Sequence, residues 1–230
     1  MTARPSLLLT GIRAAIIDLD GTMVDTAPDF HVAINRMRAD LGLGALEIDT
    51  IKDFVGKGTE NLMRRVLAVD YPPEQVEQHF PAALISYQRH YHAINGEYST
   101  VYPGVRAGLQ VLQEKKLRLA CVTNKPIAFA TPLLEKTGLL PFFEIVYGGD
   151  SLPKKKPDPA PLLQVCADFD LQPAQVVAIG DSSNDAQAAR AAGCRVLNVP
   201  YGYNHGQPIQ DVDSDGIVAT LLDAAHLISA

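Results

Sequence analysis

The sequence predicts an α/β fold, in which a Rossmann-like parallel sheet with helices on both faces carries an inserted α-helical domain. Three observations support this prediction. Short β-branched, apolar runs alternate with stretches whose apolar residues recur at helical spacing, which is typical of βαβ units. The runs are apolar almost throughout, as strands buried on both faces are. One long interval, from about Val24 to Thr100, contains no convincing strand pattern.

The strand-like runs define the expected sheet in chain order. The first covers residues 14–18, and it is followed by runs at residues 117–123, 144–147, 175–180, 194–199 and 216–219. Between the runs, apolar residues recur at helical spacing, for example Val105, Leu109 and Leu112. Because parallel strands need crossover connections that usually contain a helix, the alternation predicts a parallel sheet.

The interval between the first two strands contains only helical patterns, over residues 29–41, 48–55, 61–68 and 73–91. A helical segment of this length is expected to form a second domain threaded into the first. We therefore expect residues 1–23 and 101–230 to form the core and residues 24–100 to form a helical insert. The two crossings between them are natural hinges.

The composition excludes several classes of function. The chain has 230 residues and a formal net charge of −6, and its 47% hydrophobic content excludes wholesale disorder. Its longest block of basic residues, 154–156, does not make the basic face that nucleic-acid binding needs. The longest uncharged run, residues 196–210, is broken by prolines and glycines, so no membrane span is expected.

We expect a cytoplasmic protein. The apolar run at residues 7–9 is shorter than the hydrophobic region of a secretory signal. The cysteines are odd in number and form no CxxC pair, which is typical of reduced, buried thiols: Cys121, Cys166 and Cys194. The spacing of the histidines predicts no zinc site, and the sequence does not indicate an oligomeric state.

Acidic residues follow two of the predicted strands. Asp18 and Asp20 end the first strand, and Asp181 and Asp185 follow the fourth, near the start of the next helix. Ligands of open α/β sheets bind at the carboxyl ends of the strands. Mg²⁺ is held by one or two carboxylates together with substrate oxygens. The pattern therefore suits a hard cation, although Asp181 and Asp185 could instead cap the helix.

Polar and basic residues follow the other strands. Thr123 and Asn124 end the second strand and open a helix, and Lys156 belongs to the lysine block after the third. A phosphoryl group requires positive charge and hydrogen-bond donors on its oxygens. One carboxylate would then be left to act as a nucleophile and form an aspartyl-phosphate.

These segments resemble the four motifs of the haloacid dehalogenase-like (HAD) superfamily: Asp18-x-Asp20-Gly21-Thr22, Thr123, Lys156-Pro157 and Gly180-Asp181-x-x-x-Asp185. The helical insert resembles the superfamily's α-helical cap, and the similarity covers essentially the whole chain. Five longer segments are together similar to bacterial phosphoglycolate phosphatases: Val122 to Pro126, Gly148 to Asp150, Lys155 to Leu162, Gly180 to Asp185 and Tyr201 to Asn204.

The resemblance implies a role for each acid. Asp18 would be the nucleophile that takes the phosphoryl group. Asp20 would protonate the leaving alkoxide and then activate water. Asp181 would bind Mg²⁺ together with Asp18 and the carbonyl oxygen of Asp20, and Asp185 would support the metal shell or the active-site lysine.

The resemblance also implies how the phosphoryl group is held. Thr123 and Asn124 would bind its oxygens, and Lys156 would neutralise its charge while holding Asp18. Pro157 marks Lys156 as the matching lysine, so Lys154 and Lys155 are expected to be solvated.

The helical insert is expected to select the substrate. Lys57 lies in a glycine-flanked loop, between Gly56 and Gly58, that could approach the active site and place the lysine against a substrate carboxylate. The alternative is an ordinary helix connection with a solvated lysine. The sequence leaves both open.

The expected function is Mg²⁺-dependent hydrolysis of a small phosphate monoester, with 2-phosphoglycolate as the substrate of choice. A sugar phosphatase or a phosphomutase of the same superfamily is the alternative, and a phosphonatase is weakly supported. A dehalogenase would not need Asp20. A receiver-type signalling domain would lack the helical insert, and a binding protein without turnover would not need an acid at position 20.

Overall fold

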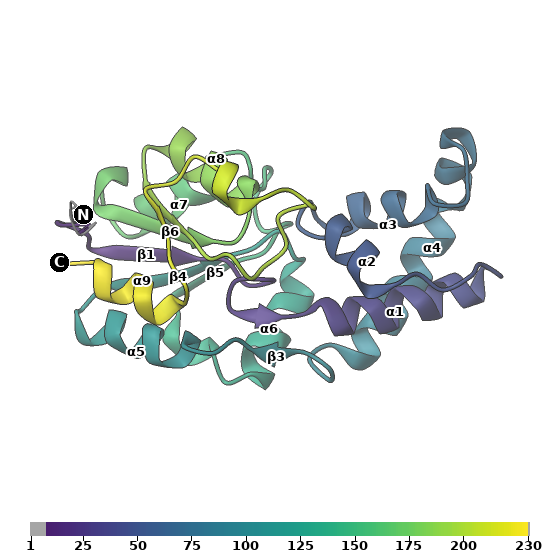
Figure 1. Ribbon diagram of the computed structural model, residues 1–230, viewed down its shortest axis with the longest axis horizontal. Helices are drawn as coiled ribbons and strands as arrows, with labels where there is room; N and C mark the ends of the chain where they lie inside the picture. The colour runs from purple at the N-terminus through teal and green to yellow at the C-terminus, as the bar shows by residue number, and fades with distance from the viewer. Residues whose placement is uncertain (1–7, 230) are drawn as a thin grey trace, which may run out of the picture.

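A six-stranded, entirely parallel sheet forms the centre of the core, and its strand order is β5-β4-β1-β6-β7-β8 (Figure 1). The computed structural model describes residues 8–229. The strands are β1 (Ala14–Ile17), β4 (Arg118–Val122), β5 (Ile145–Tyr147), β6 (Val176–Gly180), β7 (Arg195–Asn198) and β8 (Gly216–Ile217). Each lies within one of the predicted runs, and the predicted α/β fold class is confirmed.

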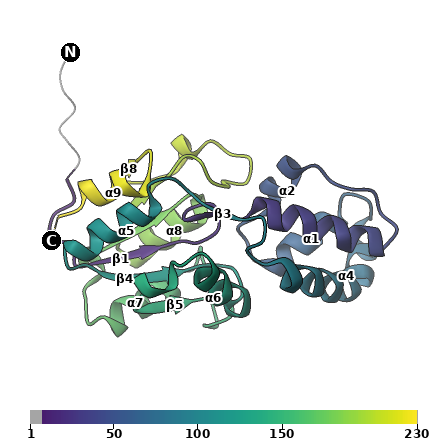
Figure 2. The ribbon, with the colours of Figure 1, turned by 90° about the horizontal axis from the view of Figure 1, so that it is seen from below.

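Helices cover both faces of this sheet (Figure 2). Ala15 and Ile17 of β1 belong to the apolar cluster that contains α5, α6 and α9, whereas Ala14 and Ile16 belong to the cluster that contains α7 and α8. Alternate residues of a strand point to opposite faces, so both faces of β1 are apolar and both are covered. These helices are α5 (Val105–Glu114), α6 (Ile127–Lys136), α7 (Ala160–Asp168), α8 (Ser183–Ala192) and α9 (Leu221–Leu227).

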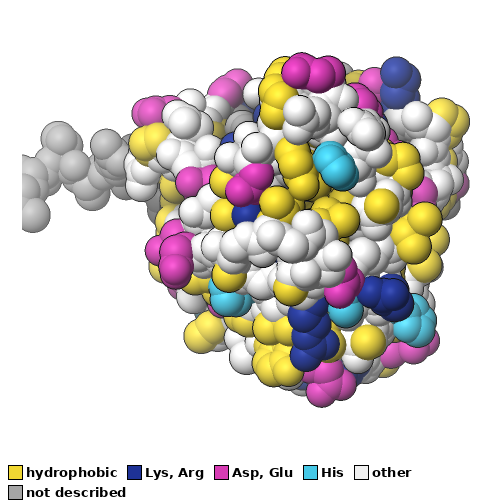
Figure 3. Space-filling view, turned by 90° about the vertical axis from the view of Figure 1, so that its right-hand side faces the viewer, with side chains coloured by type: hydrophobic (Ala, Val, Ile, Leu, Met, Phe, Trp, Pro, Cys, Tyr) yellow, Lys and Arg dark blue, Asp and Glu magenta, His cyan; other side chains and the backbone are white. Residues whose placement is uncertain are grey.

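The helical insert lies beyond the carboxyl ends of the strands (Figures 1 and 2). It contains α1 (Ala27–Asp40), α2 (Ile48–Phe54), α3 (Thr59–Leu67) and α4 (Pro73–Ile94), which pack around their own apolar cluster. Core residues Phe129 and Tyr203 join this cluster. On the face turned away from the sheet, acidic and basic side chains are interspersed (Figure 3).

Two short strands stand at the crossings between core and insert. β2 (Val24–Asp25) and β3 (Thr100–Val101) pair antiparallel, with Val24 opposite Val101. The sequence pattern predicted no strand in this interval, and that was wrong at its two ends. Each strand has only two residues and pairs with a partner far along the chain, so no local periodicity reveals it.

Tyr203, in the loop after β7, ties the core to the start of the insert. Its hydroxyl accepts hydrogen bonds from the backbone N–H groups of Thr26 and Ala27, each at 2.9 Å, and donates to the carboxylate of Asp25. The first N–H groups of a helix have no partner within the helix, so this hydroxyl satisfies two groups at the start of α1.

Two further predictions concern the chain as a whole. Among residues 8–229, no helix combines the length and the hydropathy needed to cross a membrane. The three cysteines are free and buried, as the sequence predicts. Leu7, the first residue of the short N-terminal apolar run, lies outside the described residues.

Candidate active site

Three acids lie together at the carboxyl ends of β1 and β6. Asp18 follows β1, Asp181 follows β6, and Asp185 lies in the first turn of α8. One carboxylate oxygen of each lies within 4.8 Å of the others. β1 and β6 are neighbours in the sheet, and parallel strands end at the same edge. The sheet therefore brings together acids that are far apart in the sequence, and we call them the acid cluster.

Lys156 connects two members of the acid cluster. Its Nζ lies 2.9 Å from Asp18 Oδ1 and 2.6 Å from Asp185 Oδ1, and it donates to the carbonyl of Val122 at 2.7 Å. An ammonium group has three N–H donors, so each has one acceptor here. Burial alone would lower the pKa of Lys156, but the two carboxylates raise it.

Asp185 is held from both sides. Its Oδ1 accepts from Lys156, and its Oδ2 accepts from the backbone N–H and the hydroxyl of Ser182 at 3.1 and 2.7 Å. The residue therefore caps α8 and orients the lysine at the same time. From the sequence, Asp185 could be either a helix cap or a residue of the site. Its contacts show that it is both.

Asp181 is fixed by groups from two other loops. The hydroxyl of Thr22 donates to its Oδ1 at 2.6 Å, and the backbone N–H of Tyr203 donates to its Oδ2 at 2.5 Å. Residue 202 must be glycine for this approach, because a Cβ there would lie 2.2 Å from Asp181 Oδ2.

The charges of the acid cluster are incompletely balanced. Burial raises the pKa of Asp18 to about 7, with Lys156 opposing the rise and Asp185 and Asp20 adding to it. Burial, followed by Asp185 and Asp18, also raises the pKa of Asp181 well above its usual range. The cluster has three carboxylates and one lysine, which contacts only Asp18 and Asp185. All the ligand atoms that the carboxylates offer are oxygens, so the site fits a hard divalent cation such as Mg²⁺.

Thr123 and Asn124 lie beside this cluster and are buried. Both side-chain N–H groups of Asn124 donate to backbone carbonyls, one to Gly56 of the insert at 2.9 Å and one to Lys156 at 2.8 Å. Its backbone N–H has no acceptor among the described residues. The Asn124 side chain therefore joins the insert to the core, and its backbone N–H and the Thr123 hydroxyl remain as donors that could meet an anion.

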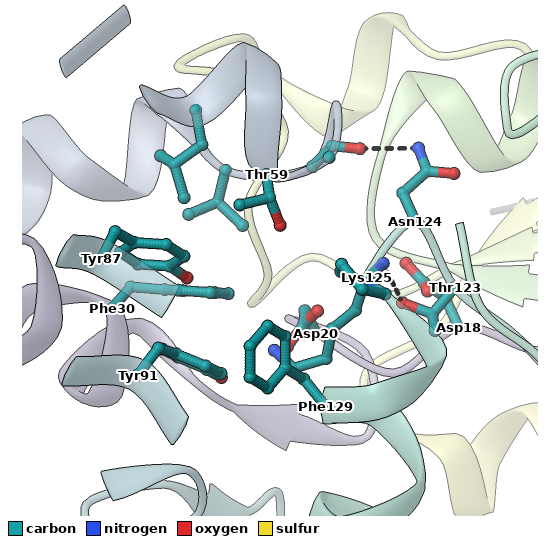
Figure 4. A pocket seen from close by; sticks show the side chains of 15 residues that line it. Asp18, Asp20, Phe30, Thr59, Tyr87, Tyr91, Thr123, Asn124, Lys125 and Phe129 are labelled. Atoms are coloured by element: carbon teal, nitrogen blue, oxygen red, sulfur yellow. Dashed lines mark hydrogen bonds and ion pairs between the residues drawn. The ribbon is translucent and has the colours of Figure 1, made fainter. Parts of the chain in front are cut away.

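A cavity of about 40 Å³ opens between Asp18 and the insert (Figure 4). Polar groups of the core line one side, and aromatic rings line the other. We call these rings the aromatic wall: Phe30 from α1, Tyr87 and Tyr91 from α4, and Phe129 from α6. The other lining residues are Asp20, Val55, Gly56, Gly58, Thr59, Leu62, Thr123, Asn124, Lys125 and Pro126.

Sequence reasoning missed Lys125, which lies in this cavity. Its side chain is 2% exposed, and its Nζ lies 2.8 Å from Asp20 Oδ1. The same ammonium lies 4.5 Å from the ring centre of Phe30 and 4.8 Å from that of Tyr91. The only sequence signal was its place directly after Thr123 and Asn124, at the predicted sheet edge.

The structure does not bring Lys57 to the cavity. Lys57 is exposed, whereas Gly56 and Gly58 on either side of it line the cavity. A Cβ at position 56 would lie 2.7 Å from the ring of His205, so glycine is required for this loop to contact the core. Lys155, which was expected to be solvated, is instead half-buried against Gly58.

Comparisons with known proteins identify a family and several similar proteins. Residues 15–199 match the sequence model of a family described as haloacid dehalogenase-like hydrolase. The chain is 49% identical to a phosphoglycolate phosphatase of Nitrosospira multiformis, over 94% of this chain and 96% of the relative. It is 45% identical to one of Thiobacillus denitrificans, over 95% and 96%.

A solved structure is similar over nearly its whole length. It is described as a predicted phosphoglycolate phosphatase from Haemophilus somnus 129PT, with 33% sequence identity and a TM-score of 0.89. The match covers 95% of this chain and 99% of the other.

Proposed function

The chain belongs to the haloacid dehalogenase-like hydrolase family, and on that premise we propose that it is a Mg²⁺-dependent phosphatase that hydrolyses 2-phosphoglycolate. One observation carries the choice of a carboxylated substrate. The cavity beyond Asp18 contains the ammonium of Lys125, whose side chain is only 2% exposed. A cation that is shielded from water favours an anionic group on the substrate.

Asp18 is the proposed nucleophile. Lys156 and the backbone N–H of Leu19 both hold its Oδ1, at 2.9 and 2.7 Å, so Oδ2 is the oxygen left to attack phosphorus. The new bond joins this oxygen to phosphorus while the bond from phosphorus to the glycolate oxygen breaks. Lys156 offsets the repulsion between the carboxylate and the phosphoryl oxygens, and Thr123 and the backbone of Asn124 hold those oxygens.

Asp20 is the proposed proton donor. It lies beside Asp18 and lines the same cavity, and it gives its proton to the departing glycolate oxygen. In the second half of the reaction it takes a proton from water, whose oxygen attacks phosphorus and releases Asp18. Phosphate leaves, and both acids return to their starting states.

Mg²⁺ would be held by Asp18, by the backbone carbonyl of Asp20 and by Asp181, and it would neutralise charge on the phosphoryl oxygens. Asp185 would support this arrangement through Lys156. The helical insert, residues 24–100, is proposed as a cap over the site. We further propose a cytoplasmic location, which the free, buried thiols support, and no nucleic-acid partner.

A panel of phosphate esters tests this function. Values of kcat/KM are compared for 2-phosphoglycolate, hexose phosphates and nucleotides, with free phosphate and the organic product both quantified. We expect 2-phosphoglycolate to be the best substrate and to release one phosphate per glycolate. An isomerised sugar phosphate would instead identify a phosphomutase, and a higher kcat/KM for hexose phosphates would identify a sugar phosphatase.

A further inference from the structure

Tyr91 carries a hydroxyl that has no partner. The residue is 0% exposed, and its Oη forms no hydrogen bond among the described residues. Leaving a buried donor unsatisfied is unfavourable, so such a group in a folded protein requires an explanation. Tyr91 also lines the cavity beside Asp18, so a ligand in that cavity could supply the missing acceptor.

The ring of Tyr91 is held firmly in place. It stacks on Phe30 and Tyr87, with ring centres 5.3 and 5.4 Å apart, and it meets the ring of Phe129 in a T-shaped contact with ring centres 5.1 Å apart. Contacts with three rings fix the plane of the side chain and therefore the place of its hydroxyl. A preorganised donor loses little freedom when a ligand binds.

Lys125 supplies positive charge at the same place. Its Nζ lies 4.8 Å from the ring centre of Tyr91, and among the described residues Asp20 is the only acceptor of its ammonium hydrogens. An ammonium group has three N–H donors, so two remain for other acceptors. The aromatic wall that surrounds it offers no oxygen except the tyrosine hydroxyls.

We propose that Lys125 and Tyr91 form the binding site for the substrate's carboxylate, at the end of the cavity opposite the phosphoryl site. This inference rests on the proposed function and identifies the residues that give it selectivity. Lys125 pairs with one carboxylate oxygen while keeping its contact with Asp20, and the hydroxyl of Tyr91 donates to the carboxylate. Figure 4 shows Phe30, Tyr87 and Tyr91 on the side of the cavity away from Asp18 and Thr123.

In this proposal, the preference for a carboxylated substrate depends on two buried residues, Tyr91 on α4 and Lys125 at the sheet edge, and does not depend on the exposed Lys57. A carboxylate satisfies both the ammonium and the hydroxyl. An alkyl group of the same size satisfies neither and leaves two buried donors unpaired, which is how polar sites reject apolar analogues.

Two substrates of matched size test the proposal. Isobutyl phosphate replaces the carboxylate of 2-phosphoglycolate by two methyl groups on one carbon, so it keeps the shape and lacks the charge. For each variant, the selectivity is the ratio of kcat/KM for 2-phosphoglycolate to that for isobutyl phosphate. Damage to folding or to the phosphoryl site lowers both values and leaves the ratio unchanged.

We expect Tyr91→Phe and Lys125→Met each to lower the selectivity about 10-fold or more, the effect of losing one hydrogen bond to a charged group. Tyr98→Phe, the same change at an exposed tyrosine outside the cavity, should leave it unchanged. Lys57→Ala should also leave it unchanged. Thermal unfolding of each variant checks that the fold is retained.

Each other outcome overturns a different statement. If the wild type prefers 2-phosphoglycolate and both cavity variants keep that preference, the carboxylate binds elsewhere while the proposed function stands. If Lys57→Ala alone loses the preference, the glycine-flanked loop supplies the cation. If the wild type shows no preference, the proposed function and the inference fail together.

Discussion

Replacing Lys156 by methionine should destabilise the protein strongly, in addition to removing activity. Methionine keeps most of the apolar stem but leaves Asp18 and Asp185 without their shared cation. The two charged contacts, at 2.9 and 2.6 Å, are worth roughly 1.5–3 kcal/mol each. Asp18 is 14% exposed and can regain some water. We therefore expect the free energy of unfolding to fall by about 3–5 kcal/mol, the usual cost of breaking a buried ion pair.

Urea unfolding followed by far-UV circular dichroism measures this change, since the chain has no tryptophan for fluorescence. Lys154→Met is the matched control, because this lysine of the same block is exposed and forms no ion pair among the described residues, so it should change the free energy of unfolding by less than about 0.5 kcal/mol. The double variant Lys156→Met/Asp185→Asn should recover part of the loss, because it removes one of the two stranded carboxylates.

Two results would refute this reasoning. A Lys156→Met variant within about 1 kcal/mol of the wild type would show that solvent or rearrangement replaces the lysine at little cost. A double variant as unstable as the sum of the two single changes would show that Lys156 and Asp185 do not stabilise one another, whatever their distance.

Four further predictions concern Asp18, the metal and the contact of Tyr203 with α1. Asp18→Asn should abolish turnover in a folded protein, and near-normal kcat would exclude aspartyl-phosphate formation. In EDTA, the pKa of Asp18 is raised from 3.8 to about 7 in the folded state. Between these two pH values Asp18 is therefore protonated in the folded state and ionised in the unfolded state. Stability from this group therefore falls as pH rises through that range, and Asp18→Asn, compared by urea unfolding, should lose that part of the slope. EDTA should abolish phosphate release and Mg²⁺ should restore it, whereas full activity in excess EDTA would exclude a required metal. Tyr203→Phe leaves the N–H of Thr26 without an acceptor and the N–H of Ala27 with only a longer one, Asp25 Oδ1 at 3.3 Å. The free energy of unfolding should therefore fall by about 1–3 kcal/mol, and an unchanged urea midpoint would contradict this.

Local patterns in the sequence were enough to predict the strands of the sheet and the helices α1 to α4. β1 and β6 are apolar throughout, and an aspartate directly follows each of them. Asp18 and Asp181 could therefore be placed at one edge of the sheet from the sequence alone. The order of the strands could not be predicted, because it depends on packing between distant segments. The pairing of β2 with β3 was missed for the same reason.

The places of the candidate site residues could be predicted where they depend on strand ends, and could not be predicted where they depend on packing of the insert against the core. Lys156 was identified through its motif, but the importance of Lys125 appears only when Phe30 and Tyr91 of the insert close around it. The glycines beside Lys57 indicated that the backbone of this loop approaches the core closely, and in the structure it does. They carried no information about the direction of the lysine side chain, which is exposed.

The β2–β3 ribbon has a consequence for how such a protein can diversify. Because Val24 lies opposite Val101, the two ends of the insert leave the core side by side, and a tight turn could join them as a hairpin. A lineage could therefore exchange the whole insert in one event without altering the order of the sheet strands. The acid cluster would be inherited intact, while Phe30, Tyr87 and Tyr91 would be replaced. Under the proposed function, the reaction chemistry would stay with the core, whereas substrate preference would be divided between Lys125 of the core and Tyr91 of the insert. The contact of Tyr203 with α1 is a constraint that any replacement insert would have to meet.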